Sequence, residues 1–122
     1  MANLRGTKWV TIDGVKYPIY MSVNSTAIYC DLRGVSLADY YNDLIAMLTG
    51  KSSPSVIRDI IYSCVKEGCR KEGQTLEIDN YTVGEYMDDM SAEDVKLILD
   101  AIAESLPKQE AVEDNPKDKK KV

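Results

Sequence analysis

The sequence of 122 residues contains no histidine, so it lacks the commonest general base and a principal metal ligand. It has only three cysteines, and we expect no hydrophobic leader, which together argue against a disulfide framework and favour a reducing cytoplasm. No apolar run approaches the roughly 20 residues that a membrane-spanning helix needs. The net charge of −5 argues against the clustered cations that nucleic-acid binding requires. We therefore expect a cytoplasmic protein that binds neither nucleic acid nor a membrane.

The few groups with catalytic potential have simpler structural explanations. Cys64 lies among apolar residues, where burial raises the pKa of a thiol and suppresses its reactivity. The acidic run at 88–94 lacks the order of ligands that a calcium loop requires, and carboxylates at a helix start are favoured by the macrodipole alone. Ser36 invites comparison with acyl carrier proteins, but Val35 precedes it where these usually have aspartate, and an N-cap explains it. We expect no enzyme, no cofactor, no metal and no small-molecule substrate.

Two β-prone runs open the chain, at Thr7–Ile12 and Val15–Met21, and Asp13-Gly14 separates them. Asp-Gly between alternating apolar residues predicts a hairpin, because both positions of the tight turn need positive φ. A two-residue turn pairs Ile12 with Val15 and Val10 with Tyr17. We expect these four residues, with Ile19, to lie on one face that covers the helices. Pro18 cannot donate to a ladder and predicts an open side on the second strand.

Helical periodicity replaces the strand pattern from Ser22 onward. The predicted starts are Ser36 with Asp39, Thr82 with Glu85 and Ser91 with Asp94, each a capping-box pattern. The following positions repeat at helical spacing and predict buried faces: Ile28, Leu32 and Val35 on the first helix; Leu37, Tyr40, Tyr41, Leu44, Ile45 and Leu48 on the second; Val95, Ile98, Leu99, Ile102 and Leu106 on the last.

The most strongly patterned segment runs from Ser53 to Arg70. Ser53 is a good N-cap and Pro54 suits the first helical position, where no N–H is lost. Apolar residues from Val56 to Val65 predict one buried face, while Arg58, Asp59, Lys66 and Glu67 are placed largely on a solvated face. Gly68 and Gly73 are the candidate stop signals. We expect this central helix to form the core.

These patterns predict a mainly α fold, with about five short helices around a central helix and an N-terminal β-hairpin. Residues 1–6 are expected to be a flexible lead-in, and residues 7–106 a single helical domain. Residues 107–122 carry many charges and few large apolar side chains, which predicts a disordered charged tail.

Tyrosine is the main aromatic residue, because the chain has eight tyrosines, one tryptophan and no phenylalanine. A tyrosine presents an apolar body and a polar tip, which suits protein–protein contacts. Tyr20, Tyr29 and Tyr62 lie off the main apolar stripes, and Tyr17 and Pro18 lie on the second strand of the hairpin. Two interpretations are open: most tyrosines lie at the edge of the core with the hydroxyl in water, or these five residues form an interface, and we take the five as the candidate interface.

The order of these pieces resembles the tail assembly chaperones of long-tailed bacteriophages. The similarity spans most of Val15–Leu106 and rests on an N-terminal β-ribbon followed by three segments. These segments are Leu32-Arg33-Gly34-Val35-Ser36-Leu37, the helix IRDIIYSCVKEGCR, and the pair that begins at Tyr81-Thr82-Val83-Gly84-Glu85-Tyr86-Met87.

The resemblance implies a non-enzymatic role in which the chaperone coats the hydrophobic helices of the tape-measure protein in the host cytoplasm until tail-tube subunits replace it. It also implies self-association. A different hypothesis is another virion structural component, or an oligomeric adaptor that uses the open edge of the hairpin for strand addition.

Overall fold

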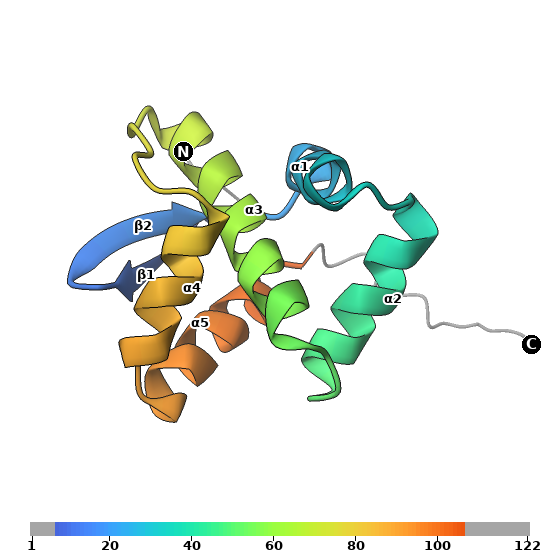
Figure 1. The fold of residues 1–122 in the computed structure, drawn as a ribbon. Coiled ribbons are helices and arrows are strands. Elements are labelled where there is room, and N and C mark those ends of the chain that lie inside the picture. The colour runs from blue at the N-terminus through green and yellow to red at the C-terminus, as the bar shows by residue number, and fades with distance from the viewer. Residues whose placement is uncertain (1–6, 107–122) are drawn as a thin grey trace, which may run out of the picture.

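The computed structural model describes residues 7–106, so the predictions for the lead-in at 1–6 and the tail at 107–122 lie outside the described residues. Five helices follow a two-stranded antiparallel sheet, which confirms the predicted fold class (Figure 1). The elements are β1 (Lys8–Ile12), β2 (Val15–Ile19), α1 (Val23–Arg33), α2 (Leu37–Leu48), α3 (Pro54–Glu72), α4 (Asn80–Asp89) and α5 (Ala92–Glu104). Helix α3 runs through the middle, with the hairpin on one side and α2 on the other (Figure 1).

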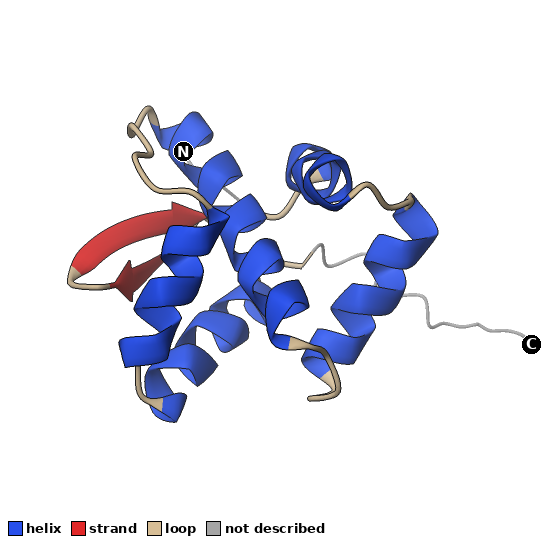
Figure 2. Cartoon of the chain, in the orientation of Figure 1, coloured by secondary structure: helices blue, strands red, loops and turns tan. Residues whose placement is uncertain are grey.

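The hairpin has the predicted register, with Val10 opposite Tyr17 and Ile12 opposite Val15. Asp13 and Gly14 form the turn with φ angles of 54° and 77°, as a two-residue turn of this kind requires. The inner face is buried as expected, except at one position. Val15 is 47% exposed, because it lies at the tip of the ribbon beside the turn. The sheet packs on α3 at one side of the molecule (Figure 2).

Helix α3 is the centre of the core, as the sequence predicts. Ser53 caps it by accepting a hydrogen bond from the Val56 N–H, and Pro54 is its first residue. Its apolar residues contact β2, α1, α2, α4 and α5. Ile61 and Val65 are completely buried. The hairpin therefore covers one side of the helix and the neighbouring helices cover much of the remainder, while Lys66 and Arg70 are exposed.

The role predicted for Gly68 as a stop signal is wrong. Helix α3 continues through Gly68 and ends at Gly73, which has the left-handed φ of 73° that favours glycine. Gly68 is needed because the backbone of β2 lies against it: a Cβ at this position would lie 2.2 Å from the Pro18 carbonyl oxygen. The Tyr20 N–H also donates to the Cys64 carbonyl oxygen at 3.1 Å. Strand β2 and helix α3 thus meet backbone to backbone.

The other predicted helix starts are confirmed by side-chain caps at two positions and corrected at a third. Ser36 and Asp39 form the predicted capping box, and Ser91 caps α5. Helix α4, however, begins at Asn80 rather than after Thr82. Asp79 is its N-cap and accepts hydrogen bonds at 2.9 Å from both the N–H and the hydroxyl of Thr82. An aspartate cap one turn earlier replaces the predicted threonine cap.

Replacing Gly68 with alanine should lower the free energy of unfolding by about 3 kcal/mol, because the added methyl group forces β2 away from α3. Urea denaturation followed by circular dichroism measures the change. The matched control is Gly84→Ala in α4, where the new Cβ meets the flexible Arg58 side chain at 3.1 Å. The control should stay within about 1 kcal/mol of the unsubstituted chain, since alanine also favours a helix. Equal effects at both positions would contradict the close approach of β2.

Candidate protein-binding surfaces

Three of the five residues predicted to form an interface are part of the core. Tyr17 and Pro18 are buried between the hairpin and the helices, and Tyr29 is completely buried in α1. The Pro18 carbonyl faces Gly68, so the expected open side of β2 is occupied by α3. In this fold Tyr17, Pro18 and Tyr29 are covered by the chain itself.

Tyr29 joins α1 to α2. Its hydroxyl donates to Asp43 Oδ2 at 2.7 Å, and its ring meets the Tyr40 ring edge-on with centroids 5.4 Å apart. Burial first, and then the hydrogen bond to Asp43, raise the pKa of Tyr29 far above its usual range. The hydroxyl is therefore a permanent donor that fixes α2 against the remainder of the fold.

The other two predicted residues, Tyr20 and Tyr62, are half-buried and lie beside lysines of α3. The Lys71 ammonium lies 4.6 Å from the centre of the Tyr20 ring, and the Lys66 ammonium lies 5.8 Å from that of Tyr62. Cation–π contacts of this kind are weak where the groups are solvated. Both rings remain accessible to a partner, but the structure does not bring the five predicted residues together into one surface.

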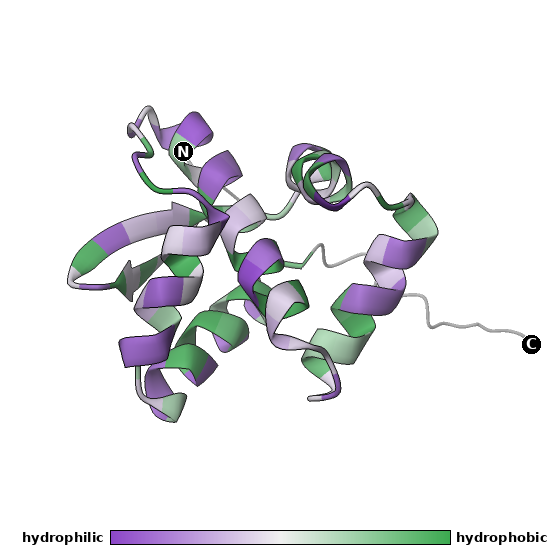
Figure 3. Cartoon of the chain, viewed as in Figure 1, coloured by the Kyte–Doolittle hydropathy of each residue, from purple (hydrophilic) through white to green (hydrophobic). Residues whose placement is uncertain are grey.

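The prediction of one buried stripe on α2 is wrong for four of its six residues. Tyr40 and Leu44 are buried, together with Met47, while four large apolar side chains face away from the core and are 42–60% exposed. We call these four the α2 outer face: Leu37, Tyr41, Ile45 and Leu48. The hydropathy colouring shows hydrophobic segments along α2 at this side of the molecule (Figure 3). The sequence already indicated an exposed apolar face on α2. Its seven large apolar residues form an arc that is too wide for one neighbouring helix to cover.

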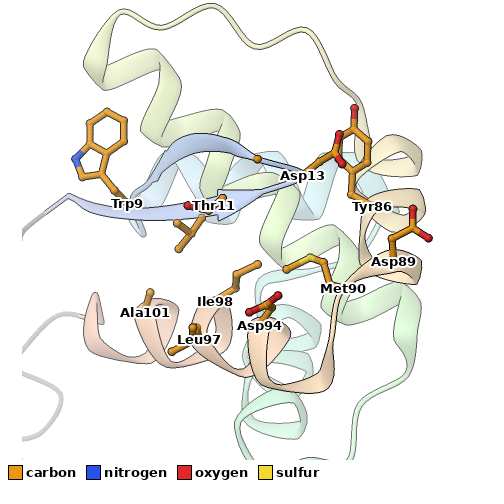
Figure 4. A pocket seen from close by; sticks show the side chains of 12 residues that line it. Trp9, Thr11, Asp13, Tyr86, Asp89, Met90, Asp94, Leu97, Ile98 and Ala101 are labelled. Atoms are coloured by element: carbon orange, nitrogen blue, oxygen red, sulfur yellow. The ribbon is translucent and has the colours of Figure 1, made fainter.

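A groove lies between the hairpin and the last two helices, with a volume of about 560 Å³. We call it the β1–α5 groove. Val10, Met90 and Ile98 form its apolar interior, and Leu97 is 62% exposed on its α5 wall. Asp89 is the last residue of α4, and Met90 is the C-cap that follows it (Figure 4). The helical periodicity of α5 did not predict this groove, because Leu97 lies outside the stripe of residues that the periodicity marks as buried.

The three carboxylates in the lining of the β1–α5 groove are all aspartates. Asp13 comes from the hairpin turn, Asp89 from α4 and Asp94 from the first turn of α5, and the lining contains no lysine or arginine. Within residues 7–106, the five ion pairs use other carboxylates. The groove is therefore apolar inside and negatively charged at its margins.

Two buried carboxylates on α3 are the strongest candidates for chemistry outside these surfaces. The prediction that Asp59 and Glu67 lie on a solvated face is wrong, because both are at most 2% exposed. Asp59 accepts hydrogen bonds from Arg33 at 2.8 Å, from Arg58 at 2.7 Å and from Asn80 at 3.0 Å. These donors come from α1, α3 and α4. The sequence pattern missed the burial of Asp59 because two of its three partners, Arg33 and Asn80, are more than 20 residues away in the chain.

Glu67 binds a second set of donors at the other end of α1. Arg70 forms a two-pronged pair with it at 2.7 and 2.8 Å, and Ser22 and Asn24 also donate. The hydrogen bond from Arg70 is the main cause that lowers the pKa of Glu67. Both carboxylates are saturated with donors and shielded from solvent, so their arrangement suits holding helices together rather than binding a substrate.

The cysteines have the buried character that the sequence predicts. Cys64 is completely enclosed in the core, and burial raises the pKa of its thiol to about 12. Cys69 is also buried and Cys30 is half-buried, and all three are free thiols. No cluster of three potential metal ligands occurs within residues 7–106. None of the helices in that range is long and apolar enough to cross a membrane.

No profile of a known protein family, no curated protein and no solved structure matches this chain.

Replacing Asp59 with asparagine should lower the free energy of unfolding at pH 7 by about 3 kcal/mol, because two arginines lose a buried counter-ion. Urea denaturation at several pH values measures it. Burial alone would raise the pKa of Asp59, but hydrogen bonds from Arg58, Asn80 and Arg33 outweigh it and lower this pKa. The stability that ionised Asp59 contributes is therefore present above the unfolded-state pKa of about 3.9 and is lost as the pH falls through the lower folded-state pKa.

The difference between Asp59→Asn and the unsubstituted chain should therefore be constant from pH 7 to about pH 4 and shrink below that. The control is Asp100→Asn, which removes an exposed ion pair with Lys96 and should change stability by no more than about 0.5 kcal/mol. A difference for Asp59→Asn that persists undiminished at pH 2 would show that ionisation of this carboxylate is not what stabilises the cluster.

Proposed function

We propose that this chain is a non-enzymatic binding protein of bacteriophage tail assembly, which holds apolar helices of the tape-measure protein on its α2 outer face. The observation that carries the proposal is the row of four large apolar side chains on α2 that the chain itself does not cover. Single exposed apolar residues are normal on a protein surface, but a contiguous row marks an interaction site.

The spacing of the α2 outer face suits a helical partner. Leu37, Tyr41, Ile45 and Leu48 follow one another at intervals of four, four and three residues, which places them in a line along one side of the helix. A partner helix can pack its own apolar ridge into this row. No charged side chain belongs to the row, so a hydrophobic segment can bind it without burying an unpaired charge.

The identity of the partner is taken from the resemblance to tail assembly chaperones. The order of the elements, a hairpin followed by five helices, supports this resemblance. Such a chaperone would act in the cytoplasm of the host cell. Self-association is part of the same proposal, because a second copy can cover the α2 outer face until the tape-measure protein displaces it. Covering this face in either way removes apolar surface from water at about 25 cal/mol per Å².

The alternative is a virion structural component or an oligomeric adaptor that accepts a strand on the hairpin. In the described part of the chain the sheet has two strands. One edge of β1 therefore pairs with β2, and no described strand pairs with its other edge. Strand addition to such an edge is a common mode of recognition. Purified phage particles distinguish the two functions, because an assembly chaperone leaves before completion and a virion component stays.

Co-expression with a phage tape-measure protein should yield a soluble complex that survives affinity purification. Ile45→Lys should reduce recovery of the complex at least about tenfold, because it places a charge in the middle of the α2 outer face. The control is Val23→Lys at the start of α1, which changes an exposed apolar residue that belongs neither to the α2 outer face nor to the β1–α5 groove. The amounts of both proteins in the soluble and bound fractions are compared on gels. Absence of any complex with the unsubstituted chain would refute the proposal.

A further inference from the structure

The β1–α5 groove is a second apolar surface, separate from the α2 outer face. It lies between the hairpin and α5, and α2 lies on the opposite side of α3 (Figure 1). Asp94, Leu97, Ile98 and Ala101 line its α5 wall, so the wall extends over about two helical turns, or roughly 10 Å. Its opposite wall is the hairpin, and Tyr86 of α4 and Met90, the C-cap of that helix, lie at one end (Figure 4).

The charge around this groove specifies what can occupy it. Asp13, Asp89 and Asp94 line the groove, its lining contains no lysine or arginine, and within residues 7–106 none of the three forms an ion pair. A negatively charged segment would be repelled, and a purely apolar one would leave the carboxylates uncompensated. A segment that carries lysine or arginine beside its apolar residues complements both features.

The position of Asp89 strengthens the argument. It lies at the C-terminal end of α4, where the macrodipole is negative and disfavours a carboxylate, and the last turn of α4 contains no basic residue. A cation from a partner would relieve this repulsion. Asp94, by contrast, lies in the first turn of α5, where the macrodipole stabilises its charge. The two carboxylates flank the short link between α4 and α5 at one end of the groove.

We propose that the β1–α5 groove binds an amphipathic helix of a partner protein, with apolar residues inserted beside Leu97 and Met90 and lysine or arginine next to the aspartates. A helix that binds in a groove inserts apolar side chains at intervals of three or four residues. The α5 wall is long enough to contact two such side chains. This inference is independent of the proposed function, because it does not involve the α2 outer face.

The test uses the full chain and two fluorescein-labelled helical peptides with identical leucine positions. One has lysine at its polar positions and the other has glutamate. Fluorescence anisotropy at low ionic strength should show the lysine peptide binding at least about tenfold more tightly, and its affinity should fall as salt screens the charges. Equal binding of the two peptides would overturn the assignment of a basic partner.

Matched variants locate the binding site. Leu97→Lys should weaken binding of the lysine peptide at least about tenfold, since it removes an apolar contact and adds a like charge. Asp89→Asn combined with Asp94→Asn should weaken it about fivefold. The control is Ile45→Lys, because Ile45 is 60% exposed on α2 and Leu97 is 62% exposed on α5. Loss of binding in Ile45→Lys but not in Leu97→Lys would assign the peptide to the α2 outer face and overturn the proposal.

The lysines at 119–121 of the same chain are the competing occupant, because they are also basic. Replacing these three lysines with glutamate in the full chain, with binding measured at about 0.15 M salt to screen the change in net charge, should leave the affinity for the lysine peptide within about threefold. A much larger gain in affinity would show that the chain's own C-terminal segment fills the groove, and would overturn the assignment to a partner protein.

Discussion

The position of the hairpin depends on one contact, the approach of the β2 backbone to α3 at Gly68. The Pro18 carbonyl occupies the space where any other residue would carry a Cβ, and the Tyr20 N–H donates to α3 just beyond it. A two-stranded ribbon is marginally stable alone, so this contact gives the hairpin its support. The hairpin in turn supplies one wall of the β1–α5 groove, which links a glycine in the core to a surface feature.

Two carboxylates of α3 fix the helices around that contact. Glu67 binds side chains at the start of α1, and Asp59 binds Arg33 at the end of α1 and Asn80 at the start of α4. Buried charges contribute little net stability when compared with apolar residues of the same size, but each leaves a costly unpaired group if its partner moves. They therefore specify which ends of the helices meet. The apolar side chains of α3, by contrast, stabilise many similar arrangements.

The surfaces that remain are of two kinds. The α2 outer face is a row of apolar residues without charge, and it favours a hydrophobic helix or a second copy of the chain. The β1–α5 groove is apolar with acidic margins, and it favours a basic amphipathic segment. Because they lie on opposite sides of α3, one partner can occupy one surface while the other stays free.

The sequence by itself determined the features that depend on near neighbours: the Asp13-Gly14 turn and its register, the caps at Ser36, Ser53 and Ser91, and the mainly helical fold. Tertiary structure decided which residues are covered. Tyr29, Asp59 and Glu67 are buried because distant segments supply their hydrogen-bond partners, while the α2 outer face is exposed because no described segment packs on it. Periodicity shows which side chains share a face of a helix, but only packing determines whether that face meets the core or the solvent.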